Sequence, residues 1–148
     1  MDKEAGLEIL QADTDSEMEL PCPDDEIKAG FPSPAENRIT ETIDLNRVLV
    51  RHRESTFYAR ISGNSMEGAG ISDGDLVVID KSLTACDGDY VAAYIDGEFT
   101  VKEFKRGKTR DEAWLVPAND NYKAIRVTAE NSFMIWGVIT YAIKKLHK

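Results

Sequence analysis

The sequence predicts an all-β domain preceded by an acidic N-terminal arm. After residue 55, short apolar runs alternate with turn-forming pairs such as Asp-Gly and Asn-Asp, a pattern typical of β-strands. The 148 residues, 42% of them hydrophobic, suit one domain with a buried core. We expect a mainly antiparallel fold with one short helix. It comprises an arm at residues 1–29, a linker with the helix at 30–55 and a β-rich domain at 56–148.

The first 26 residues carry a charge equal to that of the whole chain. They contain ten acidic side chains and one lysine, a net of −9, so residues 27–148 balance with 17 basic and 17 acidic side chains. An acidic segment with few aromatic residues buries too little apolar surface to offset its ordering entropy, and we expect the arm to be flexible. The chain also lacks the basic face that phosphate binding requires, which argues against direct binding of duplex DNA.

The linker begins with a segment that favours an extended backbone. Pro32 and Pro34 hold the residues before them extended, and Gly30 adds a flexible point with close backbone access. Such a segment is suited to lie in a cleft as an added strand.

Residues 43–50 predict one or two helical turns. Asp44 is a good N-cap residue, and Leu45, Val48 and Leu49 fall on one face of the helix. We interpret this helix as a packing element between the linker and the domain.

Seven strands are expected in the domain. They span residues 56–61, 76–80, 90–95, 98–105, 113–116, 124–128 and 133–145. The pair Asp96-Gly97 lies between the third and fourth of these strands and predicts a type I′ hairpin, since that turn needs positive φ at both central residues. The apolar run at residues 133–139 is typical of a buried core strand.

One lysine stands out because it lies inside an apolar strand. The period of two places Thr100, Lys102 and Phe104 on one face of the strand at residues 98–105, whereas most other lysines lie in polar runs. An alternative interpretation is an edge-strand lysine that discourages aggregation.

Ser65 is the candidate partner of this lysine, because it follows a strand on a glycine-bearing turn. A serine hydroxyl is a weak nucleophile until a base removes its proton, and a lysine is a base only when neutral. Lowering a lysine pKa from ~10.4 to ~7 or 8 requires about 4 kcal/mol of bias against the charged form, which burial supplies. We therefore expect Ser65 as the nucleophile and Lys102 as the general base of a serine-lysine dyad, a variant of the serine triad.

The remaining reactive side chains give no sign of a metal or another cofactor. Cys22 and Cys86 are expected to be free thiols, and His52 and His147 stand alone, without the spacing of metal ligands. No apolar run approaches 18 residues and no signal peptide is evident, so we expect a cytoplasmic protein without a membrane segment.

Several spaced motifs occur in one order along the chain. They are Ser-Gly-Asn-Ser-Met at residues 62–66, Gly-Ile-Ser-Asp-Gly-Asp-Leu at 70–76, Gly-Asp at 88–89 and Asp-Gly-Glu-Phe-Thr-Val-Lys at 96–102. Together they resemble the self-cleaving serine-lysine peptidase family that contains the LexA repressor, phage repressors and UmuD. Residues 30–35 and 43–46 resemble the UmuD branch specifically, and the resemblance runs from about residue 29 to the end of the chain.

The resemblance implies a LexA/signal-peptidase-like catalytic core and assigns roles to single residues. Ser65 matches the nucleophile, Lys102 the general base and Ala29-Gly30 the scissile bond, with the backbone amides of Ser65 and Met66 as oxyanion donors. Ala-Gly at the cleavage position is the form found in the repressors of the family, whereas UmuD has Cys-Gly.

The resemblance also implies a function and partners. A RecA filament on single-stranded DNA would stimulate self-cleavage during the SOS response. Residues 30–148 would then act as a homodimer and as the accessory subunit of an error-prone, UmuC-like Y-family polymerase in translesion synthesis. Dimers of the family pair through C-terminal strands, here residues 133–141, and the apolar run within that segment fits a core strand equally well.

Two other functions stay open. One is a binding or regulatory module on the same fold that never cleaves, which would keep partner binding after Ser65→Ala. The other is a repressor-like regulator of a phage or mobile element, although the arm shows no helix-turn-helix and no basic face. A signal peptidase has similar Ser-Met and Lys motifs but needs a membrane anchor.

Overall fold

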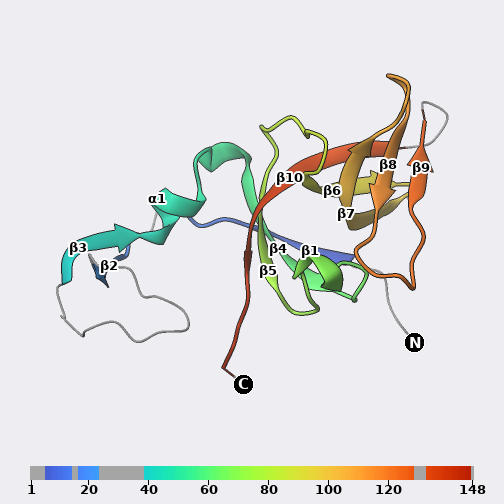
Figure 1. The fold of residues 1–148 in the computed structure, drawn as a ribbon. Coiled ribbons are helices and arrows are strands. Elements are labelled where there is room, and N and C mark those ends of the chain that lie inside the picture. The colour runs from blue at the N-terminus through green and yellow to red at the C-terminus, as the bar shows by residue number, and fades with distance from the viewer. Residues whose placement is uncertain (1–5, 15–16, 24–38, 129–132, 148) are drawn as a thin grey trace. The chain divides into compact units, whose positions relative to one another are not determined.

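The computed structural model describes residues 6–14, 17–23, 39–128 and 133–147 (Figure 1). The chain divides into two compact units: the first combines the N-terminal residues up to 12 with those from 52 onward, and the second contains residues 13–51. Most of the described elements are β-strands and the only α-helix among them is short, so the predicted all-β class is confirmed.

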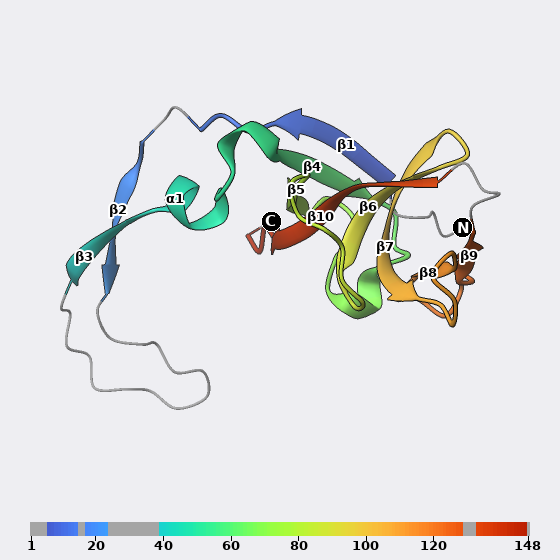
Figure 2. The same cartoon turned by 90° about the horizontal axis from the view of Figure 1, so that it is seen from above.

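The first unit is built on an eight-stranded sheet in which every pair of neighbours is antiparallel (Figure 2). Its strands, in spatial order, are β1 (Gly6–Gln11), β4 (Thr56–Ser62), β5 (Leu76–Asp80), β10 (Phe133–Ile143), β6 (Tyr90–Ile95), β7 (Glu98–Arg106), β8 (Ala113–Val116) and β9 (Ile125–Val127). All seven strands predicted from the sequence are present, and their ends lie within two residues of the predicted ones.

Two strands lie in the acidic arm, where none was predicted: β1 and β2 (Glu19–Pro23). β1 pairs with β4, from Gly6 opposite Ser62 to Gln11 opposite Phe57. Its side chains alternate at first, with partly buried positions on either side of an exposed glutamate. This alternation spans only a few residues of a segment that is strongly acidic on average. The average charge predicts a flexible arm, and β1 was therefore not predicted.

Two hydrophobic clusters form the core of the first unit. The first contains Ala59, Ile61, Met66, Ile71, Val77, Ile79, Ala92 and Val101. The second contains Ala85, Val91, Ala93, Phe104, Leu115, Val127 and Val138. Strands β6 and β7 contribute buried residues to both clusters, and β10 contributes Val138 to the second.

Strand β10 occupies the middle of the sheet. It pairs with β5 on one edge and with β6 on the other, and its register shifts between Ile135 and Gly137 and again between Ile139 and Tyr141. β6 pairs with residues 133–138 of β10 and β5 with residues 138–143, and Gly137 and Val138 are its buried residues. The strand therefore belongs to the central sheet, and dimer pairing through residues 133–141 stays a prediction.

The second unit is a small hairpin followed by a helix. β2 pairs antiparallel with β3 (Ile39–Asp44), and α1 (Leu45–Leu49) follows directly. The carboxylate of Asp44 accepts a hydrogen bond from Asn46 N at 3.0 Å, which confirms the predicted N-cap.

The apolar face predicted on this helix is not buried within the second unit, and its packing against the domain stays a prediction. Leu45 and Val48 are 55% and 40% exposed, and α1 has no buried residue. A helix of five residues is too short to present a continuous apolar stripe.

Two 3-10 helices complete the first unit, η1 (Arg53–Ser55) and η2 (Glu67–Ala69). Among the helices that the structure describes, none has the length and hydropathy needed to cross a membrane.

Candidate active site

Strand β7 places Lys102 inside the protein. β7 lies between β6 and β8, so the alternative of an edge-strand lysine is wrong. Thr100, Lys102 and Phe104 are 8%, 0% and 7% exposed, as expected for one buried face. The hairpin before it has the predicted geometry, with φ of 47° at Asp96 and 89° at Gly97.

The turn after β4 places Ser65. Gly63 has a φ of 92°, a backbone conformation that favours glycine, and Gly63 N donates a hydrogen bond to Asp73 Oδ1 at 2.8 Å. Glu67 N then donates to Asn64 O at 3.2 Å, and the chain enters η2. The turn buries Ser65 completely, at 0% exposure.

The two predicted residues meet although 37 positions separate them in the chain. Lys102 Nζ lies 3.2 Å from Ser65 Oγ. The same nitrogen donates hydrogen bonds to Thr100 Oγ1 at 2.7 Å and to Val101 O at 3.2 Å. Thr100 was predicted on this face but without a role. Its position two residues before Lys102 on the same strand is the signal that identifies it.

A segment between β8 and β9 holds the serine turn from the other side. The hydrogen bonds run from Ala118 N to Ser65 O at 2.8 Å, from Gly68 N to Ala118 O at 2.7 Å, from Asn119 Nδ2 to Asn64 O at 2.9 Å and from Tyr122 Oη to Asn64 Oδ1 at 3.0 Å. The sequence identified this segment only as a turn. No local pattern connects it to a serine more than 50 residues earlier.

The other predicted site residues lie partly beyond the described chain. Ala29 and Gly30 fall outside the described residues. Met66 is buried, and its carbonyl accepts hydrogen bonds from Ala69 N at 3.0 Å and Ile71 N at 3.2 Å, which fixes the turn after Ser65. The role of the Ser65 and Met66 amides as oxyanion donors stays a prediction.

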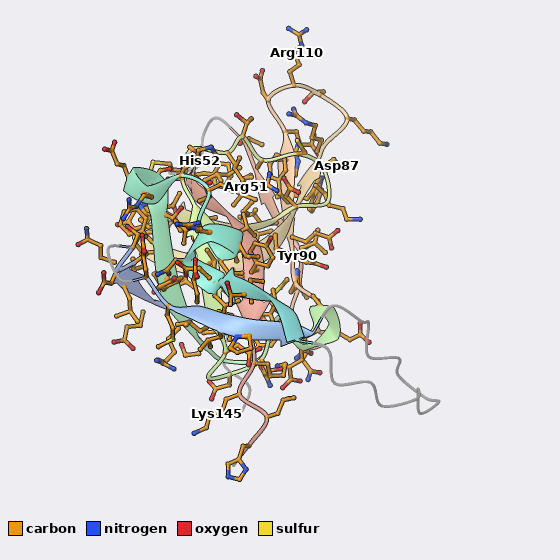
Figure 3. The ribbon with its side chains drawn as sticks, turned by 90° about the vertical axis from the view of Figure 1, so that its left-hand side faces the viewer. Arg51, His52, Asp87, Tyr90, Arg110 and Lys145 are labelled. Atoms are coloured by element: carbon orange, nitrogen blue, oxygen red, sulfur yellow. The ribbon has the colours of Figure 1, made fainter. Side chains whose placement is uncertain are left out.

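A second polar cluster contains serine, histidine and aspartate but is not arranged as a triad. His52 Nδ1 lies 2.6 Å from Asp80 Oδ2, and Ser82 Oγ lies 3.0 Å from the same nitrogen while donating to Asp80 Oδ1 at 2.6 Å. In a triad the aspartate and the serine contact different nitrogens of the imidazole. His52, labelled in Figure 3, therefore does not stand alone as predicted, and its role here is structural.

The Asp80 carboxyl is stabilised in its charged form. Burial acts to raise its pKa and is the largest single influence, but hydrogen bonds from His52, Ser82 and Ser55 together hold the pKa below its ordinary value. The cluster ties η1 and β5 together, because Ser55 belongs to the first and Asp80 to the second.

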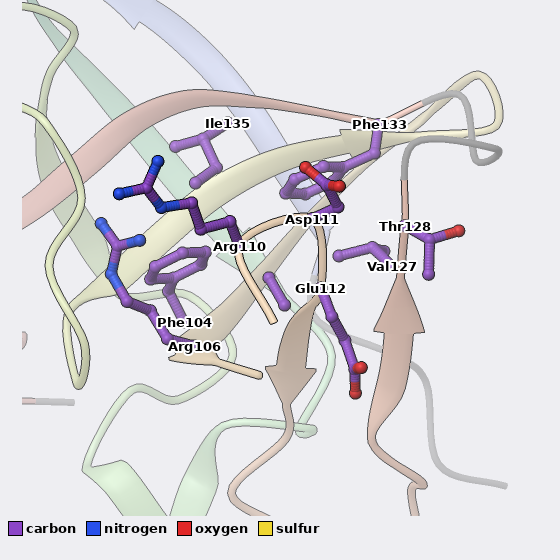
Figure 4. Close-up of a pocket in the computed structure, with 10 residues that line it drawn as sticks. Phe104, Arg106, Arg110, Asp111, Glu112, Val127, Thr128, Phe133 and Ile135 are labelled. Carbon is purple, nitrogen blue, oxygen red and sulfur yellow. The ribbon is translucent and has the colours of Figure 1, made fainter. Parts of the chain in front are cut away.

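A pocket of about 410 Å³ lies apart from the serine and the lysine (Figure 4). Figure 4 shows Arg106 and Arg110 over Phe104 on one side and Phe133 with Val127 on the other. Neither Ser65 nor Lys102 lines this pocket, so it is not the site of the predicted dyad.

Comparison with known proteins gives a consistent result. The profile of the family described as Peptidase S24-like matches residues 21–140. Protein MucA of Salmonella typhimurium is 42% identical over 118 residues, 79% of each chain, and Protein ImpA of the same organism is 40% identical over 121 residues, 82% of this chain and 81% of ImpA. The LexA repressor of Alcanivorax borkumensis is 36% identical over 143 residues, 97% of this chain and 68% of the repressor.

Proposed function

The chain belongs to the Peptidase S24-like family, as a UmuD-like member, and we propose that it is a self-cleaving SOS mutagenesis protein. In this proposal Ser65 attacks the Ala29-Gly30 bond and Lys102 is the general base. The observation that carries the proposal is the 3.2 Å separation of Lys102 Nζ and Ser65 Oγ, with both residues at 0% exposure.

The surroundings of the amine favour a base rather than a charged donor. Burial disfavours the ammonium form of a lysine, because the charge loses its hydration. A neutral amine has two hydrogens and one lone pair. In this proposal Thr100 Oγ1 and the Val101 carbonyl accept hydrogens of the amine, and its lone pair accepts the proton of the Ser65 hydroxyl, which lies 3.2 Å away.

The proposed reaction has two stages. Ser65 Oγ attacks the carbonyl carbon of Ala29 while Lys102 takes the hydroxyl proton, and the Ser65 and Met66 amides stabilise the oxyanion. Lys102 then protonates the departing nitrogen of Gly30, which leaves an ester between Ala29 and Ser65. Water hydrolyses the ester and releases residues 1–29 from residues 30–148.

The partners in this proposal follow from the UmuD-like branch. A RecA filament on single-stranded DNA stimulates cleavage by selecting the conformation in which the bond lies at Ser65, a shift of population rather than new chemistry. Residues 30–148 then act in the cytoplasm as a homodimer and as the accessory subunit of a UmuC-like Y-family polymerase. The similarity to MucA and ImpA supports this branch over a repressor.

The test is self-cleavage of the purified full chain with and without a RecA filament, followed by intact mass. Fragments 1–29 and 30–148 are expected from the wild type, and Ser65→Ala and Lys102→Ala are expected to slow their formation by ~10³-fold or more. Matched controls are Ser62→Ala, an exposed serine three residues before the nucleophile, and Lys105→Ala, an exposed lysine on the same strand.

The outcomes separate the alternatives. Both controls are expected to cleave like the wild type. Equal fragmentation of all five proteins would identify a contaminating protease, and binding of the filament by an uncut wild type would favour the non-cleaving module.

A further inference from the structure

The pocket shown in Figure 4 has no part in the proposed cleavage, yet its shape follows from the register of three strands. Arg106 on β7 pairs with Ala113 on β8, and Ala113 pairs with Val127 on β9. Residues directly opposite one another in an antiparallel sheet have their side chains on one face. The short side chain of Ala113 therefore leaves space between the arginine and the valine, and this space is part of the pocket.

The pocket has an apolar lining that belongs to the core. Phe104 and Val127 are buried members of the second hydrophobic cluster, and Phe133 and Ile135 pack against that cluster. All four line the pocket, whose volume is about 410 Å³. A cavity of this size suits a small ligand or one or two side chains of a bound peptide. Burial of an apolar group here would remove both the group and the lining from water.

Two guanidinium groups on one wall have no carboxylate partner. In the described parts of the chain, the ion pairs involve neither Arg106 nor Arg110. Arg106 Cζ lies 5.9 Å from the centre of the Phe104 ring, and Figure 4 shows both arginines on the same side of the pocket. A guanidinium group binds a carboxylate through two parallel hydrogen bonds, so this wall suits an anionic group.

The turn that carries Arg110 has a defined structure. Gly107 N donates a hydrogen bond to Glu112 O at 2.9 Å, and Glu112 N donates to Thr109 O at 3.3 Å. The backbone of Arg106 is held as well, because its N–H donates to Asp87 Oδ1 at 2.8 Å. The two arginines therefore project from a backbone that is hydrogen-bonded on both sides of the turn.

The acidic residues of the pocket favour a peptide over a nucleic acid. The carboxylate of Glu112 is already bound, since Arg126 Nη2 and Trp114 Nε1 each donate to it at 3.1 Å. Asp111 is exposed, and Figure 4 shows it toward Phe133 rather than toward the arginines. A nucleic acid carries a negative charge on every phosphate and would be repelled by Asp111. A peptide can carry one carboxylate and offer backbone N–H groups to Asp111.

We propose that this pocket binds an extended acidic segment of a partner protein. A large apolar side chain of that segment fills the space over Ala113, and a neighbouring carboxylate binds Arg106 and Arg110. The site uses neither Ser65 nor Lys102, so it is independent of the proposed function.

The experiment is a titration of the full chain, as the Ser65→Ala variant, with the fluorescein-labelled peptide Gly-Glu-Leu-Asp-Phe-Gly. Saturable binding measured by fluorescence anisotropy is expected, with amide chemical-shift changes concentrated at residues 104–113 and 133–135. A control peptide with Gln and Asn in place of the acidic residues, and another with Ser in place of Leu and Phe, are each expected to bind ~10-fold more weakly or worse.

Two kinds of substitution test the two halves of the site. Arg106→Gln and Arg110→Gln are each expected to weaken binding by ~10-fold, whereas Lys108→Gln, an exposed lysine of the same turn that does not line the pocket, changes it little. Ala113→Leu fills the pocket without changing a charge and is expected to weaken binding by ~10-fold or more. Its control is Ala124→Leu at an exposed alanine, and circular dichroism checks the fold of both variants.

The opposing results are equally specific. No saturable binding up to ~1 mM peptide overturns the proposal, as does equal binding of the amide peptide and the acidic one. Tighter binding of single-stranded oligothymidylate, lost in Arg106→Gln and Arg110→Gln, would assign the pocket to nucleic acid and also overturn it. Self-cleavage of the chain bearing Arg106→Gln at the wild-type rate is expected, and loss of cleavage there would contradict the independence of the two sites.

Discussion

Thr100 lies closer to the amine of Lys102 than Ser65 does. The distances from Nζ are 2.7 Å to Thr100 Oγ1 and 3.2 Å to Ser65 Oγ. We infer that Thr100 is a positioning residue, which orients the amine so that its lone pair faces the serine. Its effect on cleavage is exerted through Lys102 and not through the substrate.

Replacement of this hydroxyl is therefore expected to slow self-cleavage. Thr100→Val keeps the shape of the side chain but removes the acceptor, and the loss of about one hydrogen bond corresponds to a rate reduction of ~10-fold. Thr100→Ser restores the acceptor and is expected to restore most of the rate. Rates of appearance of residues 30–148 measure both effects, and a fully active Thr100→Val would contradict the positioning role.

At the residue scale, the sequence predicted the reactive groups but not their supports. Lys102 is recognisable because a lysine inside an apolar strand is unusual, and Ser65 because it follows a strand on a glycine-bearing turn and belongs to a spaced motif. Asn119 and Tyr122 lie in no such pattern. Their hydrogen bonds to Asn64 depend on the folded path of the chain, so the sequence alone did not reveal them.

At the scale of elements, the contact between η2 and the β8–β9 segment decides how firmly the serine turn is held. Gly68 N donates to Ala118 O at 2.7 Å, and a Cβ added at Gly68 would lie only 2.5 Å from that oxygen. Because the clash is with backbone, a flexible side chain cannot relieve it. The two segments must separate to accept any larger residue.

Gly68→Ala is accordingly expected to lower the free energy of unfolding by about 1–3 kcal/mol, the usual cost of overpacking. It is also expected to slow self-cleavage, because the turn that carries Ser65 shifts. Thermal unfolding followed by circular dichroism measures the first effect, with Glu67→Ala, an exposed neighbour in η2, as the control. A Gly68→Ala variant as stable as the wild type would show that moving η2 away from the β8–β9 segment has no cost in free energy of unfolding.

The elements themselves were predictable where turns delimit them. Asp96-Gly97 and the other turn pairs marked the ends of the strands from β4 to β10 to within two residues. β1 was missed because its short alternation lies in a strongly acidic segment. The pattern of Leu45, Val48 and Leu49 predicts an apolar face of α1 but not what covers it.

At the scale of the whole molecule, Asp80 links several parts of the first unit. Its backbone pairs with Thr56 on β4 and Val138 on β10, and its carboxylate accepts hydrogen bonds from Ser55 and Ser82. Its pKa in the folded protein is below the ordinary value of 3.8. The charged carboxylate therefore stabilises the fold above pH ~3.8, and this contribution is lost as the pH falls through the lower, folded-state pKa.

Asp80→Asn is expected to reduce the free energy of unfolding by about 1–3 kcal/mol at pH 7, because it weakens hydrogen bonds to a charged group. The difference from the wild type is expected to shrink as the pH falls below ~3.8. Denaturant unfolding at pH 7 and at pH 3 measures both values, with the exposed Asp120→Asn as the control. A difference that is the same at both pH values would exclude a contribution from the charge.

The order of the strands was the part of the fold that the sequence did not predict. β10 inserts between β5 and β6, and β1 reaches β4 across more than 40 residues. Such pairings depend on burial and register over the whole chain rather than on local pattern. The fold class and the family were predictable, since turn pairs and spaced motifs are local signals.

The most direct test of the central claim is the pH dependence of the self-cleavage rate at Ala29-Gly30. If the neutral amine of Lys102 is the base, the rate rises about tenfold per pH unit and then reaches a plateau. Lys102→Arg, which stays charged at every accessible pH, gives no cleavage throughout. A rate independent of pH, or a Lys102→Arg variant that cleaves with the wild-type profile, would contradict the claim.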